Sequence, residues 1–113
     1  MNKLIKTYKI ELSDSAINDI YEIRDYIALD SILVSKRIIK SILTKIKDMK
    51  YLPVRGRICP ELFEKGYPEY REIIFRIWRI IYSIEEKSIR IHAVIDSRRD
   101  FEVIIEERFL RKN

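Results

Sequence analysis

The segment from Tyr70 to Asp100 constrains the fold more than any other part of the chain. It contains three apolar runs, rich in β-branched and aromatic residues, that short polar breaks near 76–77 and 85–87 separate. Within each run side chains alternate with the period of a strand that has one buried face. The breaks leave room only for hairpin turns, so we expect three consecutive antiparallel strands. Within the first run Arg71, Ile73 and Phe75 share one side of the strand, within the second Trp78, Ile80, Tyr82 and Ile84 do so, and within the third Ile89, Ile91, Ala93 and Ile95.

The preceding half of the chain predicts one strand and two helices. Residues 6–12 alternate, with Tyr8, Ile10 and Leu12 facing one way. Ser13 then offers a helix N-cap, and Asp30-Ser31 breaks the helical spacing and can cap a second helix. The second helix ends near Lys50 or Tyr51, because the residue before Pro53 disfavours helix. The predicted apolar stripes are Ala16, Ile17, Ile20, Ile23 and Ile27 in the first helix, and Val34, Ile38, Ile42 and Ile46 in the second.

The outer side of the second helix is basic. Lysines and one arginine fill most of it, as in a solvated face opposite a buried one. A helix lying on a membrane surface has a similar pattern and is the alternative. A loop, 53–68, follows and contains all three prolines and both glycines. Loops of this length in compact domains are often functional, and Gly56 lets the backbone approach a ligand closely between Arg55 and Arg57.

The order β-αα-βββ defines an α+β fold, a two-layer sandwich with an antiparallel sheet packed on a helical hairpin. Phe101, Ile104, Ile105 and Phe109 have helical spacing, which predicts a short C-terminal helix. The 113 residues form one domain, 1–113. The sheet face away from the hairpin must be either covered by other elements or exposed to solvent.

Charge and cysteine content limit the function classes. The net charge of +5 and the pI of about 9.3 favour polyanionic partners, although a generic basic surface gives the same numbers. Cys59 is the single cysteine, so no internal disulfide forms, which fits a reducing cytosol. A small buried apolar role is the preferred interpretation of Cys59 over a catalytic thiol. Signal-peptide and transmembrane patterns are missing, and we expect a cytoplasmic protein without membrane partners.

Arginine is the most conspicuous functional residue type. Arg71 and Arg79 fall on adjacent strands and Arg98 follows the last one, so the three are expected to converge on an anionic partner. The alternative is separate ion pairs with Glu72, Glu85 or Asp100. Glu61 is a general base or an ion-pair partner, and His92, the only histidine, is a weak candidate for acid–base chemistry. No phosphate loop or metal-ligand spacing is present, so we expect neither cofactor nor metal.

The motifs together resemble a known family. They are Gly56-Arg57, Pro60-Glu61-Leu62, Tyr70-Arg71-Glu72, Trp78-Arg79-Ile80-Ile81-Tyr82 and Ser97-Arg98-Arg99-Asp100. In this order they resemble the RelE/ParE toxin superfamily of type II toxin–antitoxin systems, over roughly residues 8–101. The resemblance implies a small cytoplasmic toxin of the plasmid-stabilisation kind. It also implies a cognate antitoxin whose flexible, acidic segment covers the toxin.

The resemblance implies two possible activities. RelE-like members cleave mRNA on the ribosome, with a C-terminal tyrosine a few residues after a terminal arginine. Arg98 matches that arginine, but Ile104 stands near the tyrosine's place. We therefore expect a ParE-like inhibitor of DNA gyrase that is not catalytic. A ribosome-dependent mRNA endoribonuclease (mRNA interferase) and a non-toxic antitoxin-binding module are the alternatives.

The resemblance also implies site residues for each activity. A nuclease would use Arg79, Arg98, Glu61 and His92 as catalytic groups. Target or antitoxin binding would use Arg57, Arg71, Arg79, Arg98, Arg99 and Phe101.

Overall fold

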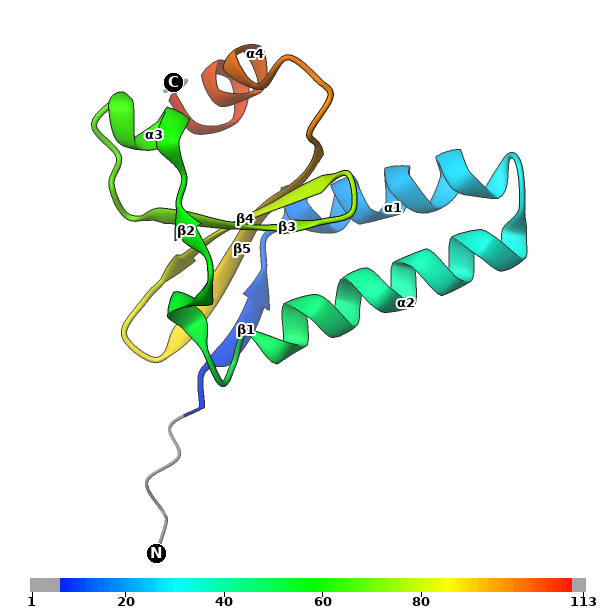
Figure 1. Cartoon of the computed structure of the whole chain (residues 1–113), viewed down its shortest axis with the longest axis horizontal. Helices are drawn as coiled ribbons and strands as arrows, with labels where there is room; N and C mark the ends of the chain where they lie inside the picture. Colours follow the sequence, from blue (N-terminus) through cyan, green and yellow to red (C-terminus); the bar gives the residue numbers. More distant parts are fainter. Residues whose placement is uncertain (1–6, 111–113) are drawn as a thin grey trace, which may run out of the picture.

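The computed structural model describes residues 7–110 and confirms the α+β architecture (Figure 1). The predicted strand, helical hairpin, three-strand unit and short C-terminal helix all form, while Lys6 of the predicted first strand and residues 111–113 of the tail lie outside the described residues. The elements are β1 (Lys9–Leu12), α1 (Asp14–Ala28), α2 (Ile32–Asp48), the 3-10 helix η1 (Pro53–Arg55), β2 (Arg57–Ile58), α3 (Pro60–Glu64), β3 (Tyr70–Phe75), β4 (Trp78–Ile84), β5 (Ser88–Asp96), α4 (Phe101–Ile105) and the π-helix η2 (Glu106–Leu110).

The sheet has five strands in the order β1-β5-β4-β3-β2. Strands β2 to β5 pair antiparallel, as the short connections predict, but β1 runs parallel to β5 and makes the sheet mixed. The connection from β1 into the sheet passes through the helical hairpin, and a connection of that length permits parallel pairing. The loop 53–68 is less irregular than predicted, because η1, β2 and α3 form within it.

The helical hairpin covers one face of the sheet. Its helices begin at the predicted caps: Ser13 Oγ accepts from the Ala16 amide at 3.0 Å, and Ser31 Oγ from the Val34 amide at 3.1 Å. Ile17 and Val34, predicted in the buried stripes, are each 37% exposed at the margin. The core beneath the hairpin comprises Ala16, Ile20, Ile42, Ile46, Met49, Ile73, Trp78, Ile80, Tyr82, Ile89, Ile91 and Val94.

The opposite face of the sheet is covered by other elements and is not exposed to solvent. The short helices α3 and α4, which lie together above the sheet in Figure 1, close over a second core. That core comprises Cys59, Leu62, Ile81, Ala93, Ile95, Phe101, Ile104 and Ile105. Burial of Cys59 there agrees with its preferred interpretation as a small apolar residue. None of the helices within 7–110 is long and apolar enough to cross a membrane.

A β-bulge in β5 overturns the predicted alternation of that strand. Ile81 pairs with Ala93 and Tyr82 pairs with Ile91, so His92 is the extra residue on β5. After the bulge the faces exchange: Val94 joins the hairpin-side core, whereas Ala93 and Ile95 join the second core. The prediction that Ala93 and Ile95 share a face with Ile91 is therefore wrong, because one inserted residue shifts the period by one.

Strands β3 and β4 are joined by a two-residue turn, Arg76-Ile77, between the paired residues Phe75 and Trp78. Arg76 has a φ of 55°, in the left-handed region, where glycine is the usual residue. The turn thus forms without glycine, at the cost of backbone strain in Arg76.

Candidate functional site

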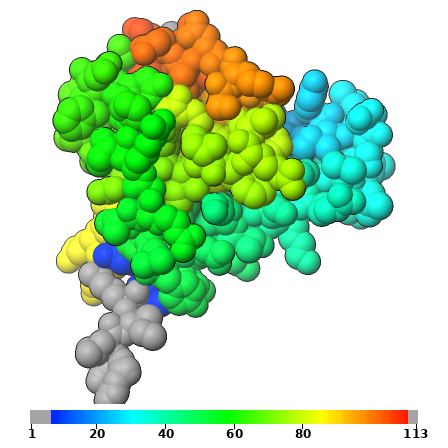
Figure 2. Space-filling view, in the orientation of Figure 1, coloured from blue at the N-terminus to red at the C-terminus, as the bar shows by residue number. Residues whose placement is uncertain are grey.

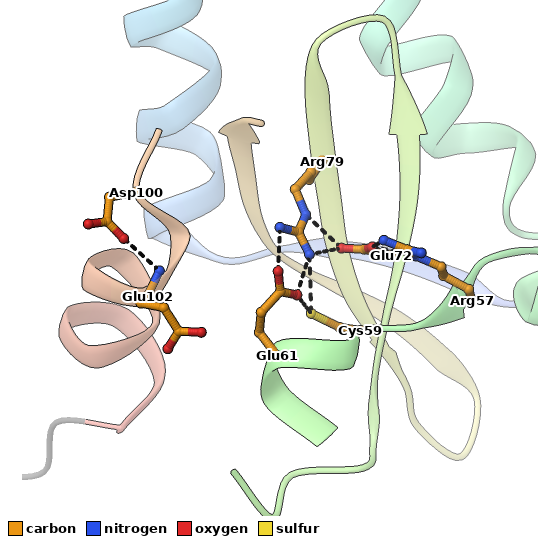
Figure 3. Close-up of polar contacts among 7 residues, drawn as sticks. All are labelled: Arg57, Cys59, Glu61, Glu72, Arg79, Asp100 and Glu102. Atoms are coloured by element: carbon orange, nitrogen blue, oxygen red, sulfur yellow. Dashed lines mark hydrogen bonds and ion pairs between the residues drawn. The ribbon is translucent and has the colours of Figure 1, made fainter. Parts of the chain in front are cut away.

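The second core contains a buried network of arginines and glutamates (Figure 3). Arg79 of β4 lies between Glu72 of β3 and Glu61 of α3. Its Nε donates to Glu72 Oε1 at 2.8 Å, and its Nη1 and Nη2 donate to the two Glu61 oxygens at 3.1 and 2.6 Å. On the far side, Arg57 of β2 donates to Glu72 Oε2 through Nε at 2.7 Å. The network therefore pairs two cations with two anions.

Burial makes this network different from a surface ion pair. Arg79 is 7% exposed and Glu72 is 1% exposed. Desolvation alone would lower the pKa of Arg79, but the hydrogen bonds to Glu61 and Glu72 raise it above the ordinary value. The same bond to Arg79 lowers the pKa of Glu61. Glu61 is therefore an ionised ion-pair partner, one of the two roles predicted for it, and is poorly suited to accept a proton.

Two further side chains close over Arg79. The Phe101 ring lies over the guanidinium, 3.7 Å from its carbon to the ring centroid, in a cation–π contact. Asp100 caps α4 by accepting from the Glu102 amide at 3.1 Å (Figure 3). Phe101 is the first residue of this capped helix. Cys59 Sγ lies 3.8 Å from Arg79 Nη2, and burial raises the pKa of this thiol to about 11. The thiol is thus protonated and unreactive at neutral pH.

Cys59, Glu61 and Glu72 also form a group of possible metal ligands. One ligand atom from each lies within 4.8 Å of the others. The Arg79 guanidinium already bonds both carboxylates, however, and supplies the positive charge that a metal ion would supply. The donor set is therefore satisfied by arginine.

Arg71 does not join Arg79. It pairs with Tyr82, so its side chain lies on the hairpin side of the sheet, whereas Arg79 pairs with Ile74 and faces the second core. Arg71 Nη1 donates to the Gly56 carbonyl at 2.7 Å. The prediction that Arg71, Arg79 and Arg98 converge is thus wrong, because the hairpin register places the first two on opposite faces.

The backbone at Gly56 does make a close contact, but its partner is the Tyr82 side chain of the same chain and not a ligand. The Gly56 amide donates to Tyr82 Oη at 3.0 Å, and that hydroxyl donates to the Pro53 carbonyl at 2.6 Å. A Cβ on Gly56 would lie 2.5 Å from Tyr82 Oη. These contacts hold the start of the loop against the sheet.

Arg98 and Arg99 lie in the exposed turn after β5. Arg98 forms a two-point ion pair with Asp96, at 2.9 and 2.6 Å, and this pair lowers the pKa of Asp96 to about 2. Both arginines line a groove of about 520 Å³ between this turn and α1. The apolar lining of the groove comprises Ile23, Tyr26, Ile27, Ile77, Trp78 and Val94.

His92 is enclosed at the bulge of β5. Its Nε2 lies 2.8 Å from Ser83 Oγ, and its ring contacts Tyr70 edge-on at 5.0 Å. Burial lowers the pKa of His92, which is therefore neutral at pH 7. Within residues 7–110 it contacts neither Arg79 nor Arg98. The four groups predicted for a nuclease therefore split into a paired Arg79–Glu61, an enclosed His92 and an Arg98 that pairs with Asp96.

One ion pair had no signal in the sequence. Arg108 of η2 donates to both carboxylate oxygens of Asp19 in α1, at 3.1 and 3.0 Å, and to the His92 carbonyl at 3.0 Å. The Val94 amide donates to the same carboxylate at 2.9 Å. These contacts fasten the C-terminal segment to the helical hairpin across the end of the sheet. Arg108 and Asp19 are 89 positions apart in the sequence, so no local sequence pattern predicts their ion pair.

Comparisons with known proteins agree with this architecture. A family model described as "ParE toxin of type II toxin-antitoxin system, parDE" matches residues 10–101. A solved structure of the chromosomal ParDE toxin–antitoxin system from P. aeruginosa has 16% sequence identity and a TM-score of 0.66. That match covers 80% of this chain and 96% of the other. The RelBE2 toxin–antitoxin complex from Mycobacterium tuberculosis matches at 14% identity and a TM-score of 0.63, over 84% and 97% of the two chains. A comparison with curated proteins gives no match.

Proposed function

The chain belongs to the ParE toxin family of type II toxin–antitoxin systems, and we propose that it arrests growth by binding DNA gyrase without cleaving nucleic acid. One observation carries the proposal. Arg79, one of the residues predicted to be catalytic in a nuclease, is neutralised by Glu61 and Glu72 and covered by Phe101. Phosphoryl transfer needs a cation that can reach the negative charge that develops in the transition state. The guanidinium of Arg79 is buried and already paired, so it cannot serve this purpose.

The C-terminal segment supports the same proposal. Ile104, near the place where RelE-like nucleases keep a tyrosine, is 4% exposed in the second core. Its apolar side chain holds α4 on the sheet and offers no proton for a leaving oxygen. The segment that would bring an acid to the site therefore acts here as part of the core.

Gyrase binding is assigned to the groove beside Arg98 and Arg99. Both arginines are exposed there, next to apolar side chains such as Trp78 and Tyr26. Exposed arginine with aromatic and aliphatic neighbours is the composition of a protein-binding surface. Of the other predicted binding residues, Arg57 is 65% exposed in its side chain and can contribute, whereas Arg71, Arg79 and Phe101 position the covering elements.

A cognate antitoxin in the cytoplasm completes the proposal. The net charge of +5 suits an acidic antitoxin segment. Both solved structures described above are of toxin–antitoxin systems, which supports such a partner for this chain.

Induced expression in a bacterial host tests the target. Plasmid DNA and mRNA are followed in the same culture, for the wild type, for Arg98→Gln/Arg99→Gln and for the charge-matched control Lys9→Gln/Lys87→Gln. We expect growth arrest with cleaved DNA and intact mRNA from the wild type and the control, and loss of both effects in the groove variant. Rapid loss of mRNA with intact DNA would instead identify a ribosome-dependent nuclease. A soluble protein that leaves growth unchanged would identify an antitoxin-binding module.

A further inference from the structure

Helix α2 carries a dense row of positively charged side chains. Helix α2 carries five basic residues and one acidic residue, Asp48, and therefore has a net charge of +4. In residues 7–110, the sheet and turn arginines Arg57, Arg79, Arg90 and Arg98 each have a carboxylate partner within 4.0 Å. None of the five α2 cations has one in the same range. These five are Lys36, Arg37, Lys40, Lys45 and Lys47.

Helix geometry arranges the α2 cations as a stripe. Lys36, Lys40 and Lys47 fall within about 40° of one another around the axis and span about 16 Å along it. Arg37 and Thr44 flank the stripe, and all five side chains are exposed. Like charges at a spacing of four residues, such as Lys36 and Lys40, destabilise a helix. The stripe therefore costs stability in the isolated chain, and an anionic ligand would relieve this repulsion.

The other side of α2 restricts what the ligand can be. Ile42 and Ile46 are 0% and 1% exposed against the sheet, so this apolar stripe of the helix is taken up by the protein's own core and is not available to a ligand. The hairpin also projects from the body of the molecule, as the cyan lobe in Figure 2 shows. The exposed row of cations is open to a long, rigid polyanion.

We propose that this face of α2, defined by Lys36, Arg37, Lys40, Thr44 and Lys47, binds the phosphate backbone of duplex DNA. Duplex DNA presents one negative charge per about 1.7 Å of axis and a condensed layer of counterions. A row of unpaired lysines about 16 Å long releases several of these counterions on binding. An acidic peptide has a lower and more flexible charge density, and so gains less from the same row. The proposal goes beyond gyrase binding and does not depend on it, because it concerns the chain and DNA alone.

Fluorescence anisotropy with a labelled 20-base-pair duplex, at salt concentrations from 50 to 200 mM, measures this binding. The stripe variant is Lys36→Gln/Lys40→Gln/Lys47→Gln. The control, Lys9→Gln/Lys65→Gln/Lys87→Gln, removes the same charge from exposed positions away from α2. Circular dichroism and thermal unfolding verify that both variants are folded. Poly-glutamate, a duplex RNA of the same sequence and anionic vesicles serve as competitors.

We expect saturable binding by the wild type and the control, with a slope of log affinity against log salt of about −3.6 for four phosphate contacts. The stripe variant should bind about tenfold or more weakly at 50 mM salt, with a slope closer to −0.9. Equal binding by the stripe variant and the control would overturn the proposal, as would the absence of saturable binding by the wild type at 50 mM salt. Competition by poly-glutamate, duplex RNA or vesicles as effective as that by unlabelled duplex DNA would also overturn it.

Discussion

Replacing Arg79 by methionine tests whether the buried network is structural. Methionine keeps the unbranched apolar stem and removes the guanidinium, so the contact with Phe101 loses its charge while most of the packing volume is kept. The change leaves Glu61 without its partner and leaves Glu72, whose side chain is 0% exposed, with Arg57 alone. The perturbation therefore produces a buried carboxylate that is only half compensated.

The expected loss in the free energy of unfolding of Arg79→Met follows from the burial of Glu72. Removing one partner of a buried ion pair costs about 3–5 kcal/mol of the free energy of unfolding. Because Arg57 still binds Glu72 Oε2 at 2.6 Å, and because Glu61 is 28% exposed and can rehydrate, we expect the lower end, about 3 kcal/mol. A domain of this size has a total of about 5–15 kcal/mol, so most of the variant remains folded in buffer.

Urea unfolding measures the loss, and the chain offers a matched control. Arg98→Met removes a guanidinium that also lies 2.6 Å from its carboxylate, but its side chain is 69% exposed, so a far smaller loss is expected. The double variant Arg79→Met/Glu72→Met removes the orphaned charge, and it should recover most of the stability lost in the single variant. Equal losses in Arg79→Met and Arg98→Met, or no recovery in the double variant, would refute the reasoning.

Three further predictions concern the turn, the loop and the histidine. Arg76→Gly should stabilise the protein by about 1 kcal/mol in urea unfolding, because it relieves the strain of a φ of 55°, whereas Ile77→Gly in the same turn should destabilise it. Gly56→Ala should cost about 1–3 kcal/mol in the same assay, because the new Cβ meets the Tyr82 hydroxyl; an unchanged midpoint would contradict that packing. Burial lowers the pKa of His92, so the unfolded chain binds the proton more readily, and stability should fall as the pH drops below about 6.5; His92→Asn should flatten the fall in melting temperature between pH 7 and pH 5.

The elements of the fold were predictable because their signals are local. The periods of α1 and α2, and the caps Ser13 and Ser31, depend on residues within a few positions of one another. The bulge at His92 is different: it is an extra residue relative to the neighbouring strand, and only the pairing with β4 reveals it. A pattern read along β5 alone therefore assigned Ala93 and Ile95 to the wrong face of the strand.

Which arginines meet at the site depends on the pairing register of β3 and β4, and the sequence alone did not determine that register. With Phe75 opposite Trp78, Arg71 faces Tyr82 and lies across the sheet from Arg79. A turn longer or shorter by one residue would have placed the two arginines on one face, because a slip of one position exchanges the faces of a strand. The turn lacks the glycine or asparagine that signals its type, so the predicted convergence rested on an undetermined register.

The most direct test of the proposed function is a supercoiling assay with purified gyrase, relaxed plasmid, ATP and the purified protein. We predict that equimolar protein inhibits supercoiling and traps cleaved DNA, that the control Lys9→Gln/Lys87→Gln behaves in the same way, and that Arg98→Gln/Arg99→Gln does neither. Full supercoiling in the presence of excess folded protein, together with cleavage of mRNA in a translating extract, would contradict the account.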